Sequence, residues 1–168
     1  MIFLLNWLQQ VWSELDGTQL RDNILSFQIA LARLSIVFLD VGYDEMSRKV
    51  VFGVILLSSV GKFAVAVNGP LWNNILSALM AETTVCKEAL EWLKTRGVTS
   101  VRLFSDCSIL CHNLLPYANP QSYVCIINNE CKKLFCSFVS CSVCFVLRSS
   151  NTLGVLLAMN AYAQAYAM

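Results

Sequence analysis

The stretch that decides the fold reads SIVFLDVGYDEMSRKVVFGVILLSSVGKFAVAV and runs from Ser35 to Val67. It contains three apolar runs rich in β-branched and aromatic residues, SIVFLD, KVVFGVILL and KFAVAV, separated by segments typical of turns. Consecutive runs joined by short turns pair as antiparallel neighbours. We therefore predict three antiparallel strands here, with the second turn near Ser59–Lys62.

The apolar run from Val50 to Val67 also approaches the length of a membrane-spanning helix, and the mean hydropathy of the chain is +0.59. Gly61 and Lys62 interrupt it together with two serines, which a spanning helix tolerates poorly. The hairpin explains the run better, so we expect no membrane association. The opening MIFLLNWL lacks the basic region and cleavage site of a secretory signal, and we expect an intracellular protein, nuclear or cytoplasmic.

Helical and strand patterns alternate after this stretch. A helix is predicted from Leu76 to Leu93, over LSALMAETTVCKEALEWL, with its end near Gly97. VTSVRLFSD and SVCFVLR predict a fourth and a fifth strand, and further helices are expected over about 107–115, 123–138 and 151–166. This order predicts an α/β fold with a five-stranded mixed sheet flanked by helices. We place one domain over residues 35–168 and expect residues 1–34 to be a helical lead-in or the remnant of a longer chain.

Three acidic residues stand where apolar ones would be expected or where strands end. Glu82 lies near the middle of the apolar arc of the helix over residues 76–93. A buried carboxylate needs a partner, a metal or a changed proton affinity. Asp40 and Asp106 end the apolar runs of the first and fourth predicted strands. We therefore expect the three carboxylates to converge at the sheet.

Converging carboxylates predict a particular chemistry. They repel one another unless a cation lies among them. Carboxylate and water ligands suit Mg²⁺ or Mn²⁺ better than zinc. Two such ions about 4 Å apart can activate a water and stabilise the departing oxygen of a phosphodiester. The three acids therefore predict a nuclease site for phosphoryl transfer.

Four segments, in order and at suitable spacing, carry a family resemblance: DVGYDE at 40–45, LMAE at 79–82, FSDCSIL at 104–110 and FVLRSSN at 145–151. The chain resembles the ribonuclease H type-1 family, most closely the plant, retrotransposon-related RNase H-like domain. The resemblance implies an RNase H-like fold and metal-dependent endonucleolytic hydrolysis of the RNA strand of RNA–DNA hybrids. It places Asp40, Glu82 and Asp106 at three of the four acidic positions of the family, as catalytic and metal-binding residues for Mg²⁺ or Mn²⁺.

The last predicted helix departs from the family pattern, which reads N-x-x-A followed by Asp or His. Here NTLGVLLA puts Gly154 at the alanine and Val155 at the fourth acidic position, so that a second ion would depend on water and substrate phosphate. The rival hypothesis is accordingly a catalytically degenerate RNase H-like domain that binds nucleic acid or a protein partner without turnover. The formal charge of +1 gives no general basic field, so nucleic-acid contact requires a local group, for which Arg148 is the candidate. The sequence does not indicate an oligomeric state, and we take a monomer as the default.

The singled-out residues also have structural interpretations. Asp106 would cap the helix that follows it, Asp40 would be a turn residue, and Arg148 would be a surface charge. The tryptophans Trp72 and Trp92 are expected in the core rather than as platforms for bases.

The cysteines raise the question of zinc. Cys141 and Cys144 form the spacing C-x-x-C, but the chain has no second such pair and one histidine, His112. We expect most of the eight cysteines to be small buried apolar residues rather than zinc ligands or disulfides.

Overall fold

A five-stranded mixed sheet forms the centre of the protein. The computed structural model describes residues 34–71, 75–118 and 123–166. The strands are β1 (Ser35–Asp44), β2 (Lys49–Leu57), β3 (Phe63–Pro70), β4 (Ser100–Ser105) and β5 (Ser140–Phe145), in the order β3-β2-β1-β4-β5. β1, β2 and β3 are antiparallel neighbours, whereas β4 runs parallel to β1 and β5 parallel to β4. The predicted sheet is confirmed. The predicted lead-in over residues 1–34 lies, apart from Leu34, outside the described residues, as does Trp72.

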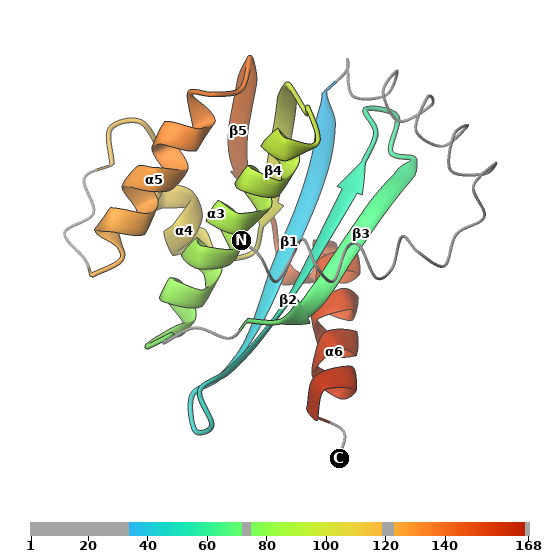
Figure 1. Cartoon of the computed structure of the whole chain (residues 1–168), viewed down its shortest axis with the longest axis vertical. Coiled ribbons are helices and arrows are strands. Elements are labelled where there is room, and N and C mark those ends of the chain that lie inside the picture. Colours follow the sequence, from blue (N-terminus) through green and yellow to red (C-terminus); the bar gives the residue numbers. More distant parts are fainter. Residues whose placement is uncertain (1–33, 72–74, 119–122, 167–168) are drawn as a thin grey trace.

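Helices cover both faces of this sheet. They are α3 (Ala78–Thr95), α4 (Ser108–Asn113), α5 (Cys125–Phe135) and α6 (Thr152–Tyr166), with a short 3-10 turn, η1 (Arg148–Ser150), before α6. Figure 1 shows α3, α4 and α5 grouped together and α6 apart from them, against β1, β2 and β3. The predicted helices are thus confirmed, with ends shifted by a few residues.

The hairpin predicted from the apolar run is present. The turn between β2 and β3 closes through the amide of Ser58, which donates to the carbonyl of Lys62 at 2.8 Å. Gly61 in this turn has a φ of 74°, which a residue without a side chain adopts at little cost. In the part of the chain that the structure describes, no helix has the length and apolar character needed to cross a membrane.

α3 begins and ends where its sequence signals lie. The hydroxyl of Ser77 accepts a hydrogen bond from the amide of Met80 at 3.1 Å and caps the helix. Gly97 follows the helix with a φ of 73°. Trp92 is 7% exposed and belongs to the core, as predicted.

β1 is buried on both faces, and this positions the site. Val37, Leu39 and Val41 belong to the same core cluster as the buried face of α3. Because side chains alternate along a strand, Asp40 points to the opposite face, where α6 lies. Asp40 is nevertheless only 1% exposed.

Gly53 explains why α6 can cover Asp40. It pairs with Asp40 across β1 and β2, so the two residues share a face of the sheet. A Cβ atom at Gly53 would lie 2.6 Å from Cβ of Leu157 and 2.7 Å from the amide nitrogen of Ala158. The backbone of α6 therefore lies directly on the sheet at this pair, and the first turn of α6 is brought next to Asp40.

Candidate functional site

The register between β1 and β4 brings the two aspartates level with each other. The parallel pairing of these strands runs through Phe38, which is opposite Phe104. Asp40 and Asp106 each lie two residues beyond this pair. Two residues preserve the direction of a side chain along a strand, and neighbouring strands are about 4.8 Å apart. The pairing alone thus predicts that the carboxylates of Asp40 and Asp106 face a common space.

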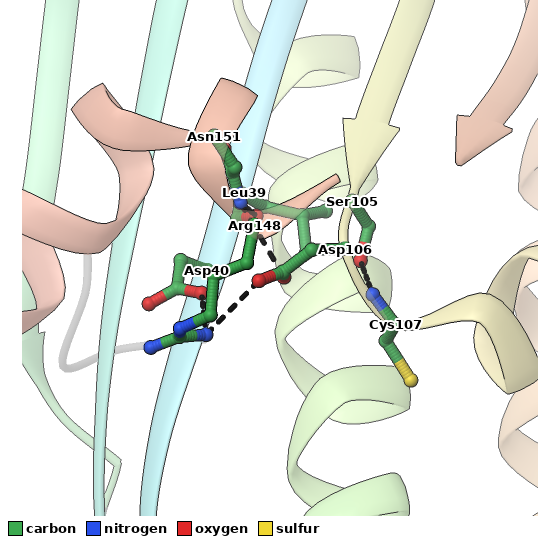
Figure 2. A network of polar contacts seen from close by, with 7 residues as sticks. All are labelled: Leu39, Asp40, Ser105, Asp106, Cys107, Arg148 and Asn151. Atoms are coloured by element: carbon green, nitrogen blue, oxygen red, sulfur yellow. Dashed lines mark hydrogen bonds and ion pairs between the residues drawn. The ribbon is translucent and has the colours of Figure 1, made fainter. Parts of the chain in front are cut away.

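A basic side chain fills that space. Nη1 of Arg148, in η1, donates to Oδ1 of Asp40 at 3.1 Å and to Oδ2 of Asp106 at 2.9 Å. The side chain of Arg148 is 63% exposed, whereas those of Asp40 and Asp106 are 1% and 6% exposed. Figure 2 shows the guanidinium group lying across the two carboxylates. The residue considered for nucleic-acid contact is therefore engaged with the two aspartates.

Asn151 holds the start of α6 against β1. Its side-chain amide donates to the carbonyl of Leu39 at 2.8 Å and, at 3.5 Å, to Oδ1 of Asp106 (Figure 2). Asn151 is fully buried. Sequence reasoning did not single it out, because its partner, the carbonyl of Leu39, is 112 positions away in the chain. The signal that could have found it is its place in the FVLRSSN segment.

Gly154 allows the close approach. A Cβ atom at this position would lie 2.8 Å from Oδ1 of Asn151 and 3.2 Å from Cβ of Asp40. The alanine expected from the family pattern would press on both side chains. The glycine is therefore part of how this chain fits Asn151 beneath its last helix.

Glu82 lies on α3, and the charges of both aspartates affect its pKa. Its Oε2 atom is buried and has no hydrogen-bond partner among the described residues. Burial and, after it, the negative charges of Asp40 and Asp106 raise its pKa to about 8, against the opposing effect of Arg148. Glu82 thus lies near enough to both aspartates for their charges to act on it.

The pKa of Asp40 is also raised, to about 6. Burial is the largest cause, Arg148 opposes it, and the charge of Asp106 adds to it. An arginine at 3.1 Å thus only partly compensates the desolvation of this carboxyl group. The acids of the site are under-neutralised, and this is the electrostatic condition in which a further cation binds well.

The three acids nevertheless form no ready-made metal site in this structure. Within the described ranges, no three His, Cys, Asp or Glu side chains lie close enough together to hold a metal ion. The assignment of the three acids as ligands of one ion stays a prediction, and in this structure Arg148 occupies the space between Asp40 and Asp106. Val155, half-buried in the first turn of α6, adds no ligand.

The structural interpretations of the aspartates are wrong. Asp40 lies inside β1, paired with Gly53, and it is Asp44 that serves the turn by accepting from the amide of Met46 at 3.0 Å. The N-cap residue of α4 is Cys107 and not Asp106, and the amide of Cys107 donates to Oγ of Ser105 at 3.0 Å. Neither aspartate of the site is explained by a local backbone role.

Cys107 lies next to Asp106, but the C-x-x-C pair and the histidine do not form a zinc site. His112 is exposed on α4, and Cys141 and Cys144 both lie in β5. Residues three apart in a strand point to opposite faces, so this pair does not offer two thiols to one ion. All eight cysteines are free thiols, but only three of them are buried, so the prediction that most would be buried is wrong.

The chain is similar to several proteins of known structure. The chain is similar to RNase H1 from the halophilic archaeon Halobacterium salinarum NRC-1, with 18% identity and a TM-score of 0.71 over 79% of this chain and 99% of that one. An N-terminal RNase H domain from Mycobacterium tuberculosis has 14% identity and a TM-score of 0.70 over 79% of this chain and 96% of that one. LC11-RNase H1 in complex with an RNA/DNA hybrid has 15% identity and a TM-score of 0.68, covering 78% of this chain and 98% of that one.

At these identities the likeness shows the fold, and the predicted RNase H-like fold is confirmed. Among curated proteins nothing matches the chain. The family described as reverse transcriptase-like matches residues 38–161.

Proposed function

The chain belongs to the reverse transcriptase-like family, and from this premise we propose that it binds nucleic acid and cuts the RNA strand of RNA–DNA hybrids with the help of a divalent metal. The observation that carries the proposal is the pair Asp40, in β1, and Asp106, directly after β4, whose side chains are 1% and 6% exposed and whose charges act on Glu82. One of the similar structures holds an RNA/DNA hybrid, which supports the substrate class.

The donor set suits Mg²⁺ or Mn²⁺, because all three candidate ligands are carboxylates. The raised pKa values of Asp40 and Glu82 and the unpartnered Oε2 of Glu82 fit a site that gains a cation. Asp40 and Asp106 would hold it, with Glu82 helping. When bound, the metal would supply activation of a water and stabilisation of charge on the phosphate oxygens.

The residues of this chain have separate tasks in such a reaction. Asn151 fixes α6 and Asp106 relative to β1, so that the carboxylates keep their register. Arg148, largely exposed, can donate two parallel hydrogen bonds to a phosphate oxygen pair. Glu82 has a pKa near 8 without metal and can accept or release a proton near neutral pH.

The second candidate function is a degenerate domain that binds hybrid without cutting it. Val155 favours it, because no carboxylate stands at the fourth acidic position implied by the family resemblance. Weak binding of a second ion would then leave binding of the hybrid intact but abolish its cleavage.

Cleavage of an end-labelled RNA–DNA hybrid in Mg²⁺ or Mn²⁺ tests the proposal. We expect the native chain to cut the RNA strand, and we expect Asp106→Asn to lower the rate by about a hundredfold or more. Asp44→Asn is the matched control, because Asp44 is an acid of the same sheet that serves only a turn. Binding of the hybrid without cleavage would support the degenerate domain, and equal rates in native and Asp106→Asn proteins would overturn the assignment of Asp106.

A further inference from the structure

The positive charge between Asp40 and Asp106 is the guanidinium group of Arg148. One nitrogen, Nη1 of Arg148, lies 3.1 Å from Oδ1 of Asp40 and 2.9 Å from Oδ2 of Asp106. A divalent ion held by Asp40 and Asp106 would need their oxygens at close range, about 2.1 Å for Mg²⁺. It would occupy the space in which Nη1 lies. The guanidinium group and the ion cannot both use these oxygens.

We infer that Arg148 competes with Mg²⁺ or Mn²⁺ for Asp40 and Asp106. In the metal-free chain the guanidinium group of Arg148 blocks the proposed metal site. The inference rests on the proposed function in taking these aspartates as metal ligands. Arg148 therefore opposes metal binding, in addition to any contact that it makes with a phosphate.

The burial of the three side chains says which partner moves. Asp40 and Asp106 are 1% and 6% exposed, while Arg148 is 63% exposed. Asp40 is fixed within β1, and Asp106 is held by Asn151. Arg148 belongs to a 3-10 turn of three residues, and its long side chain can rotate into solvent without disturbing a strand. The metal therefore gains its ligands by displacement of Arg148 and not by movement of the aspartates.

Mg²⁺ binding to the whole chain, measured by calorimetry without nucleic acid, tests the competition. Arg148→Gln should bind Mg²⁺ about threefold to tenfold more tightly than the native chain, because a charge-assisted competitor is gone. Arg102→Gln removes the same charge from an exposed position in β4, four residues and roughly 13 Å before Asp106 along the strand. Its affinity should match that of the native chain, since a charge at that distance is screened.

Unchanged or weaker Mg²⁺ binding in Arg148→Gln overturns the inference, and so does equal tightening in Arg102→Gln. A second measurement needs no variant at all. The side-chain NεH resonance of Arg148 in the native chain should shift during a Mg²⁺ titration with the midpoint found by calorimetry. A resonance that stays in place through saturation would show that the ion binds without displacing the arginine.

The outcome is separable from that of the proposed function. If Arg148→Gln binds metal more tightly but the chain cuts no hybrid, the inferred competition is supported and the proposed nuclease function is rejected. If the chain cuts hybrid but Arg148→Gln has the native Mg²⁺ affinity, the nuclease function is supported and the competition is rejected.

Discussion

Within the described residues, two groups in which one basic side chain lies among several carboxylates can be compared, and they differ in burial. Lys87 on α3 lies 3.6 Å from Glu88, 3.5 Å from Glu91 and 3.7 Å from Glu130, with all four side chains between 22% and 46% exposed. In the site, Arg148 lies on two aspartates that are at most 6% exposed. We call the first group the Lys87 cluster.

The pKa values show what burial changes. In the Lys87 cluster, burial lowers the pKa of the lysine, and the three glutamates outweigh it, so the pKa ends above its ordinary value. In the site, burial dominates and drives the pKa of Asp40 to about 6 and that of Glu82 to about 8. Each group has one positive charge and three acids, but water solvates the excess negative charge of the Lys87 cluster, whereas burial in the site favours the protonated form of Asp40 and Glu82. The charge pattern alone does not distinguish them.

The largest expected effect concerns Glu82 and pH. Its folded pKa of about 8 lies above the ordinary 4.5, so the folded state binds the proton more tightly than the unfolded state. The associated stability is fully present below pH 4.5 and is lost as the pH rises through 8. Glu82→Gln should therefore be more stable than the native chain at pH 8, by roughly 2 to 4 kcal/mol in the absence of metal.

Urea unfolding between pH 5 and pH 8 measures this difference. Glu91→Gln, from the Lys87 cluster, should keep the native dependence on pH. If Glu82→Gln shows the same loss of stability with rising pH as the native chain, the glutamate is not the buried acid of the site.

A second effect comes from the contact that seats α6. Gly53→Ala should lower the free energy of unfolding by about 2 kcal/mol, because its Cβ would lie 2.6 Å from Leu157 and 2.7 Å from the backbone of α6. Gly69→Ala is the matched control in the neighbouring strand, where the added carbon would meet only the ring of Phe52 at 3.8 Å. Thermal unfolding compares them. Equal melting temperatures would mean that α6 is free to move away from the sheet, and the placement of Asn151 would lose its support.

A third effect restores the missing acid. Val155→Asp should bind Mg²⁺ about tenfold more tightly, about 1.4 kcal/mol, because a fourth carboxylate adds a ligand and a charge. Without metal the variant should be about 1 kcal/mol less stable, since Val155 is half-buried. Added Mg²⁺ should offset this loss. Val155→Asn controls for polarity alone. A folded Val155→Asp protein with native Mg²⁺ affinity would show that position 155 does not face the ion.

The sequence was sufficient for the fold because its signals are local. The three apolar runs from Ser35 to Val67 and the helix from Ala78 carry their own periodicity, turns and caps. Asp40 and Glu82 could be singled out because each is an acid among apolar neighbours. Arg148 could not be placed on the aspartates, because that contact joins residues 108 and 42 positions apart in the chain. Asn151 was missed for the same reason, since its partner is the carbonyl of Leu39.

The smallest expected effect is in the Lys87 cluster. Lys87→Gln should lower the free energy of unfolding by at most about 1 kcal/mol, because exposed ion pairs are weak and the order Lys87 before Glu91 is the less favourable one on a helix. The contact with Glu130 joins α3 to α5, so a small loss is still expected. Urea unfolding in low salt and in about 1 M NaCl measures it, and the difference from the native chain should vanish in high salt, where the Debye length is about 3 Å. Mg²⁺ affinity should stay native, in contrast to that of Arg148→Gln. A loss above about 2 kcal/mol that persists in salt would place the Lys87 cluster with the buried site, and burial would then no longer separate the two.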